Sequence, residues 1–136
     1  MMTKSEVLIR TILGKVQYDI RPFIYSLDVA CELLAVSENM WDEICVTRDI
    51  YRVAARRLGK KTETVARSAE RLANLCWDSM DQQMVLKYIG EPIRDINAPS
   101  ELIFYLAFYI RHGKPYYKVV RERFELFFVR EHAEVR

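Results

Sequence analysis

The sequence contains few of the residues that interrupt helices, ligate metals or form cross-links. Its 136 residues include four glycines, four prolines, two histidines and three cysteines. The cysteines, Cys31, Cys45 and Cys76, are odd in number and too far apart for a zinc site or a redox dithiol. Each falls in an apolar helical pattern, so we expect three buried, reduced thiols and no metal.

Membrane and export signals are also missing. No apolar run approaches the roughly 20 residues that a membrane-spanning helix needs. The N-terminal stretch, MMTKSEVLIR, lacks the apolar segment and the cleavage site of a secretory signal. We therefore expect a cytoplasmic protein that does not associate with membranes.

The motifs of most catalytic sites are absent too. The sequence has no Gly-rich phosphate loop, no nucleophile elbow and no His-x-x-x-His pair. His112 is explained as a cation near a helix C-terminus, and His132 lies close to the end of the chain. We expect no enzymatic activity, no cofactor and no small-molecule substrate.

The few glycines divide the chain into helices. Each glycine follows a stretch with helical periodicity, as expected of a residue that ends helices in the left-handed conformation. No stretch shows a clear two-residue alternation, so we predict a compact all-α fold. Thr3 and Thr62 are the expected N-caps of the first and fifth helices. The predicted helices span residues 4–13, 22–37, 40–49, 51–58, 62–78, 82–89, 100–112 and 115–132.

Positive charge is concentrated in one short segment. The chain has a formal net charge of +2, yet residues 52–71 carry seven basic and two acidic side chains, which leaves the rest slightly acidic. A basic patch on an acidic body indicates a local anionic partner, whereas a generally adhesive basic protein spreads its charge more evenly. The basic residues of this segment are Arg52, Arg56, Arg57, Lys60, Lys61, Arg67 and Arg71.

The same segment has the spacing of a helix-turn-helix. Ala55 permits the close approach of two helices, Gly59 permits a tight turn, and Val65 packs the second helix on the first. In this motif the second helix enters the major groove of DNA. We therefore predict a helix-turn-helix at about residues 51–78 that binds double-stranded DNA. The alternative is that these charges form the solvated surface of an ordinary helical hairpin.

The outward positions of the second helix are the predicted DNA contacts. Thr64, Arg67 and Arg71 lie at helical spacings opposite the apolar face, so we expect them to reach base edges. Arg67 has the donor geometry to bond a guanine bidentately. Backbone phosphates are expected to meet the turn, the helix start and the preceding helix. The residues predicted for these phosphate contacts are Arg56, Lys60, Lys61 and Thr62.

Several stretches resemble one known family. Residues 51–77, YRVAARRLGKKTETVARSAERLANLCW, are similar to the helix-turn-helix of the C-terminal DNA-binding domain of the sporulation-initiation transcription factor of endospore-forming bacteria. ILGKV at 12–16, FIYSLDVACELL at 23–34 and YIGEPIRDINAPSELIFYLAFYI at 88–110 extend the resemblance over about residues 8–112. It implies an all-α transcriptional regulator that binds duplex DNA.

The sequence resembles the family in its scaffold, but it differs at the outward positions of the second helix that would contact DNA bases. Arg67 alone keeps the family's arginine among the outward positions. Thr64 and Glu70 stand where the family has arginine, Ala66 where it has glutamate and Arg71 where it has histidine. The family's target sequence is therefore not expected here. The match begins near residue 8, so we also expect no phosphoacceptor receiver domain in this chain.

Residues 114–136 follow the predicted helix-turn-helix domain, residues 1–113, and lie beyond the region of resemblance. They carry a helical apolar stripe that either packs on the same globule or joins two copies as a homodimer. The residues of the stripe are Tyr117, Val120, Phe124, Phe127 and Phe128. Together these observations predict a sequence-specific DNA-binding transcriptional regulator. The alternative is the same fold without DNA binding, acting as a protein-interaction or regulatory module.

Overall fold

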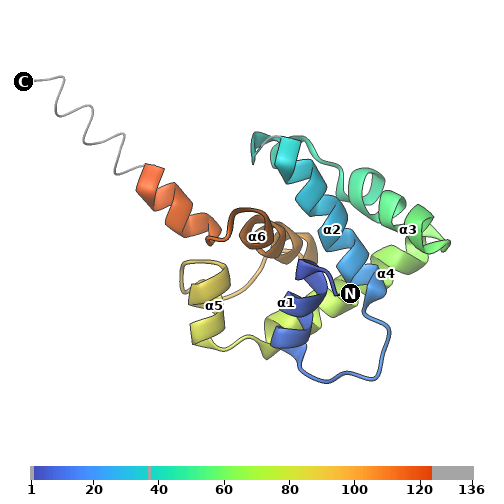
Figure 1. Cartoon of the computed structure of the whole chain (residues 1–136), viewed down its shortest axis with the longest axis horizontal. Coiled ribbons are helices and arrows are strands. Elements are labelled where there is room, and N and C mark those ends of the chain that lie inside the picture. Colours follow the sequence, from blue (N-terminus) through green and yellow to red (C-terminus); the bar gives the residue numbers. More distant parts are fainter. Residues whose placement is uncertain (1, 37, 124–136) are drawn as a thin grey trace, which may run out of the picture.

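All regular secondary structure in residues 2–36 and 38–123, the ranges that the computed structural model describes, is helical (Figure 1). This confirms the predicted all-α fold. No helix within those ranges combines the length and the apolar character needed to cross a bilayer. The α-helices are α1 Lys4–Leu13, α2 Arg21–Val36, α3 Arg52–Leu58, α4 Thr62–Ser79, α5 Gln82–Tyr88 and α6 Pro99–His112. A 3₁₀-helix, η1, spans Glu38–Glu43, and a π-helix, η2, spans Val46–Tyr51.

One core joins the helices, and α2, α4 and α6 supply most of it. α2 packs against both α4 and α6, which also pack against each other. Phe23 and Leu27 of α2, Leu72 of α4 and Leu106 of α6 are fully buried. Figure 1 shows α4 crossing the domain from α3 at one end towards α5 at the other. The core therefore holds α4 along its length, with its two ends on opposite sides of the domain.

The first helix follows the predicted pattern closely. The Thr3 hydroxyl accepts a hydrogen bond from the Glu6 backbone N–H at 3.2 Å, as an N-cap does. The Glu6 carboxylate accepts a hydrogen bond from Arg10 at 3.1 Å and, within the described residues, none from the Thr3 N–H, so no reciprocal capping box forms. Leu8, Ile9 and Ile12 face the core. The capping signal thus located the start of α1 correctly.

The predicted helix at 40–49 is wrong. This stretch divides into η1 and η2, with residues 44 and 45 between them, and η2 continues directly into α3. The Asp49 carboxylate accepts a hydrogen bond from the Cys45 backbone N–H at 2.9 Å, which starts a new helical turn at that point. The Arg52 N–H then bonds to the Thr47 carbonyl, five residues earlier, as in a π-helix.

The prediction for the cysteines is only partly right. Cys76 is buried, and burial raises the pKa of its thiol to about 12. Cys31 is half-buried, and its thiol donates a hydrogen bond to the Ala107 carbonyl at 3.6 Å. Cys45 is exposed because it lies in the break between η1 and η2 rather than on a buried helical face. All three are free thiols.

The chain beyond α6 turns back onto the domain. Residues 116–123 are helical, and the predicted remainder of this helix, with Phe124, Phe127 and Phe128, lies outside the described residues. The Tyr117 and Tyr105 hydroxyls are 2.9 Å apart, and Arg121 donates to the Gly90 carbonyl at 2.9 Å. Val120 is exposed. The start of this helix thus packs on its own domain, while the homodimer stays a prediction.

Gly90 is the position where this packing is tightest. Its φ is +96°, and an added Cβ would lie 3.1 Å from the Lys118 nitrogen and 3.2 Å from the Pro115 Cβ. Gly59 also has a positive φ, of +67°, but an added Cβ would meet no described heavy atom within 4 Å.

We therefore expect Gly59→Ala to lower the free energy of unfolding by about 1–2 kcal/mol, from backbone strain alone. Gly90→Ala should add an overpacking cost of about 1–3 kcal/mol, because the start of the C-terminal helix must shift. Urea unfolding followed by circular dichroism measures both. Equal losses for the two variants would contradict this packing of residues 115–118 on Gly90.

Candidate nucleic-acid interface

α3 and α4 are joined by a turn that Gly59 makes possible. Gly59 adopts the left-handed conformation at φ 67° and ψ 33°. Its N–H donates to the Arg56 carbonyl at 3.3 Å, and the Lys60 N–H donates to the Ala55 carbonyl at 3.0 Å. This pair of bonds is a Schellman motif, which satisfies the last carbonyls of α3. The chain reverses there, and α4 begins at Thr62.

The two helices meet through small and branched apolar side chains, as predicted. Ala55 is 2% exposed, and Val65 and Ala69 are fully buried. α3 and α4 pack against each other, and both pack against α2. Because one face of α4 is buried against α2 and α3, the side chains on its opposite face point to solvent.

The outward face of α4 carries the residues predicted to read bases. Thr64, Arg67 and Arg71 are all exposed. Neither arginine forms an ion pair with any residue in the described ranges. The exposed stripe continues through Asn74 to Asp78, which is acidic. The basic part of this face therefore ends at Arg71, near the middle of α4.

The start of α4 differs from the prediction that Thr62 is its N-cap. Lys61 has extended backbone angles, φ −73° and ψ 143°, and occupies the N-cap, whereas the half-buried Thr62 is already in the helix. No side chain among the described residues caps this end. The first N–H groups of a helix have no intrahelical acceptor, so those of α4 remain available to an anion.

Two of the basic residues at the turn have carboxylate partners. Arg57 forms a bidentate pair with Glu32 of α2 at 2.9 and 2.7 Å. Lys60 Nζ lies 3.5 Å from Asp19, whose carboxylate also accepts two hydrogen bonds from the Arg21 guanidinium. Arg21 chiefly, and Lys60 in addition, hold the pKa of Asp19 well below its usual range.

The basic surface thus contains cations of two kinds. Arg56 and Lys61 are exposed, and like Arg67 and Arg71 they form no ion pair with a described residue. The sequence predicted Lys60 and Lys61 as equivalent phosphate contacts. In the structure Lys61 has no acidic partner among the described residues, whereas Lys60 has Asp19 beside it. A phosphate at Lys60 would have to compete with that carboxylate.

Glu70 differs from Arg67 and Arg71 in its burial. It is half-buried, and α4 packs against η2 on that side. Burial, and to a smaller extent the charge of Glu70, raises the pKa of Tyr51 in η2. The Tyr51 hydroxyl is buried and has no hydrogen-bond partner in the described part of the chain. Glu70 therefore lies at the edge of the outward face, on the side of α4 that packs against η2.

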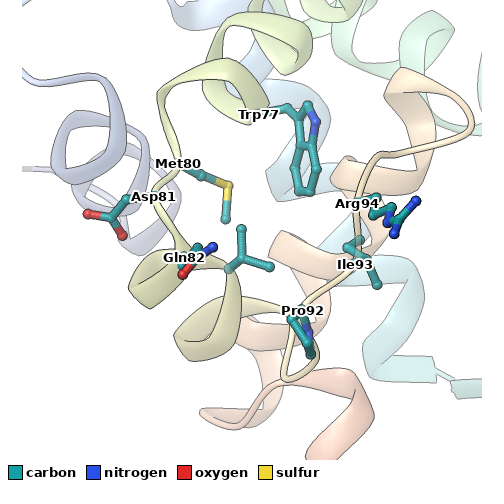
Figure 2. A pocket seen from close by; sticks show the side chains of 8 residues that line it. Trp77, Met80, Asp81, Gln82, Pro92, Ile93 and Arg94 are labelled. Carbon is teal, nitrogen blue, oxygen red and sulfur yellow. The ribbon is translucent and has the colours of Figure 1, made fainter.

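A pocket of about 380 Å³ lies at the other end of α4 (Figure 2). Trp77, Met80 and Ile93 contribute apolar walls. Asp81 points away from the pocket in Figure 2, and its carboxylate caps α5 by accepting from the Met84 N–H at 2.8 Å. Because the pocket lies at the C-terminal end of α4, it is separate from the basic surface around the Gly59 turn. That the chain is not an enzyme stays a prediction.

Comparison of this sequence and fold with known proteins finds no relative. No family model matches the sequence, and no curated protein or solved structure matches it. The resemblance to the sporulation regulator rests on the residues quoted above.

The Asp19 ion pairs give stability a defined pH dependence. The pKa of Asp19 is lowered by folding from 3.8, so its charge stabilises the folded state at neutral pH, and this contribution is lost as the pH falls below about 4. Asp19→Asn keeps an oxygen for the Arg21 N–H bond but removes the charge. Because Asp19 is 40% exposed, we expect a loss of at most about 1 kcal/mol at pH 7.

Urea unfolding at pH 7 and pH 3 measures this effect. The difference between Asp19→Asn and the wild-type chain should narrow at pH 3, where the carboxyl of the unfolded wild-type chain is mostly protonated. A difference of the same size at both pH values would show that the ion pairs with Arg21 and Lys60 add no stability.

Proposed function

We propose that this protein is a DNA-binding transcriptional regulator in which α3, the Gly59 turn and α4 act as a helix-turn-helix. One observation carries the proposal. Four exposed cations without acidic partners among the described residues lie around the turn and along α4 as far as its middle. They are Arg56, Lys61, Arg67 and Arg71. A cluster of this kind on a helix pair is the electrostatic footprint of duplex DNA.

In the proposed complex, the N-terminal half of α4 enters the major groove. Arg67 and Arg71 present guanidinium groups to base edges, with Thr64 one turn earlier as a smaller donor or acceptor. Lys61 and the uncapped N–H groups of α4 meet a backbone phosphate beside the groove. Arg56 contacts the phosphates from the end of α3. The family resemblance supports the same assignment, through the scaffold rather than through these side chains.

The alternative is the same fold acting as a protein-interaction or regulatory module without DNA. The carboxylates beside Arg57 and Lys60 favour this alternative, since they reduce the positive charge of the surface. The two functions differ in a simple measurement. DNA binding through phosphates weakens with salt by about 0.9 log units per log unit of salt for each phosphate neutralised.

The direct test is fluorescence anisotropy with duplexes selected from the host genome. Arg67→Ala should weaken binding to a selected site by about 1–3 kcal/mol and relax its sequence preference. Lys61→Ala should lower the affinity for all duplexes alike. It should also reduce the slope of log affinity against log salt by about 0.9, the value for one phosphate contact. Lys118→Ala is the matched control, because Lys118 is exposed on residues 116–123, at the other end of the domain in Figure 1. If no selected duplex binds in a salt-dependent way, the DNA-binding proposal fails.

The paired cations make a second prediction about the same surface. Glu32→Gln removes the carboxylate that holds Arg57, so Arg57 becomes available to phosphate and one repulsive charge disappears. We expect duplex affinity to rise by about two- to fivefold, the range set by exposed ion pairs.

The matched control is Glu91→Gln. Glu91 also has an arginine beside it, Arg121 at 3.6 Å, but it lies in the connection between α5 and α6, away from the turn. Its replacement should leave duplex affinity unchanged. Equal effects of the two substitutions would mean that only net charge matters and that Arg57 makes no phosphate contact.

A further inference from the structure

A groove on the side away from the Gly59 turn is built differently from the basic surface. It has a volume of about 480 Å³ and lies between α1, the end of α5 and the end of α6. In Figure 1, α5 lies at the opposite end of the domain from α3. A molecule bound in this groove would leave the helix-turn-helix free.

One face of α1 forms a wall of the groove. Lys4, Val7, Leu8 and Thr11 all line it, and they follow the i, i+3, i+4, i+7 spacing that aligns side chains along a helix. Val7 is 48% exposed, although it is a large apolar residue on an otherwise well-packed helix. The Thr11 hydroxyl donates to the Val7 carbonyl at 2.7 Å, so its one donor hydrogen is used within the helix. This wall therefore combines apolar surface from Val7 and Leu8 with the polar ends of Lys4 and Thr11.

The floor of the groove is aromatic and already packed. Tyr88 and Tyr109 meet edge to face with ring centroids 5.0 Å apart, and Ile110 lies beside Tyr109 in α6. Tyr88 is buried and held in the core. A preformed floor lowers the ordering cost of binding, because few side chains must be immobilised when a ligand arrives.

The charges at this groove have one sign. Among the residues that the structure describes, Lys4 and Lys87 are the charged ones that line it, and no carboxylate does. Neither lysine forms an ion pair with a described residue; Lys87 Nζ lies 5.5 Å from the centroid of the Tyr88 ring. The nearby acidic residue of α1, Glu6, is bonded to Arg10 and does not line the groove. An occupant must therefore bring both apolar surface and negative charge.

We propose that this groove binds an acidic amphipathic helix of a partner protein. Leucine-like side chains at i, i+3, i+4 and i+7 would lie along Val7, Leu8, Tyr109 and Ile110, and carboxylates on the flanks would meet Lys4 and Lys87. An amphipathic helix suits this groove, because the apolar side of the helix can cover the exposed apolar surface while its polar side stays in water. An anionic membrane surface has similar chemistry, but it favours a protruding apolar ridge over a concave groove.

The probes are two synthetic amphipathic helices with the same leucine pattern, one with glutamates on its flanks and one with lysines. Labelled peptides are titrated with the wild-type chain and with Lys4→Glu/Lys87→Glu, a double substitution of exposed residues. The acidic peptide should bind the wild type, and the double variant should bind it about tenfold more weakly. The basic peptide should show the reverse order of affinity.

The control is Arg52→Glu/Arg94→Glu, which changes the net charge equally at two exposed residues that do not line the groove. Its affinity for the acidic peptide should match that of the wild type. Amide chemical shifts should change at Val7, Tyr88 and Ile110 and not around Gly59. This inference does not depend on DNA binding, since all the measurements are made without DNA.

Three outcomes would overturn the proposal. The first is that neither peptide binds. The second is that the acidic peptide binds all variants equally, or shifts the amides of α3 and α4, which would show attraction to the basic surface instead. The third is that the wild-type chain sediments with phosphatidylglycerol vesicles while the acidic peptide fails to bind, which would assign the groove to a membrane surface.

Discussion

The burial of the inner face of α4 is the constraint on which the rest of the structure depends. Val65, Ala69 and Leu72 are fully buried, and the helix packs against α1, α2, α3 and α6. Rotating α4 about its axis would return this apolar surface to water at about 25 cal/mol for each Å². The burial therefore dictates which side chains face outward. The exposure of Arg67 and Arg71 is a consequence of the core, and no contact made by the arginines themselves is needed to explain it.

Ion pairing then divides the cations that the fold brings together. Glu32 reaches Arg57 from α2, and Asp19 reaches Lys60 from the loop before α2. Both contacts link the turn region to a part of the chain far away in the sequence. They reduce the positive charge of the turn region. Of the seven basic residues at 52–71, five have no acidic partner among the described residues, and four of these, Arg56, Lys61, Arg67 and Arg71, lie around the turn and along α4.

Local patterns predicted the features that arise from local physics. The glycine at 59 indicated a left-handed helix end, and the spacing from Ala55 to Val65 indicated which side chains pack; both are confirmed. Most helix boundaries followed from caps and breaks in periodicity. The predicted helix at 40–49 is wrong because a single side-chain bond, from the Cys45 N–H to Asp49, outweighs the periodicity there.

Local patterns could not predict the ion pairs, because these depend on contacts between residues far apart in the sequence. Arg57 and Glu32 are 25 residues apart, so their pairing depends on how α2 and α3 cross. Glu70 borders the outward face, and only the packing of α4 on η2 shows that it is half-buried. The sequence predicted each of the candidate contacts as exposed, which holds for all except the half-buried Thr62. It did not predict which of them has a partner.

The lysine at the N-cap of α4 has a consequence for hydration. Serine, threonine, asparagine and aspartate at this position bond the free N–H groups of a helix with their own oxygens, and lysine has no oxygen to offer. In the free protein those groups must therefore be satisfied by solvent. Ordered water molecules at the start of α4 would be released when an anion arrives, and each release returns translational freedom to the bulk. Lys61 is a weaker N-cap than serine or aspartate, and for that reason the release of water makes anion binding at this end of α4 entropically favourable.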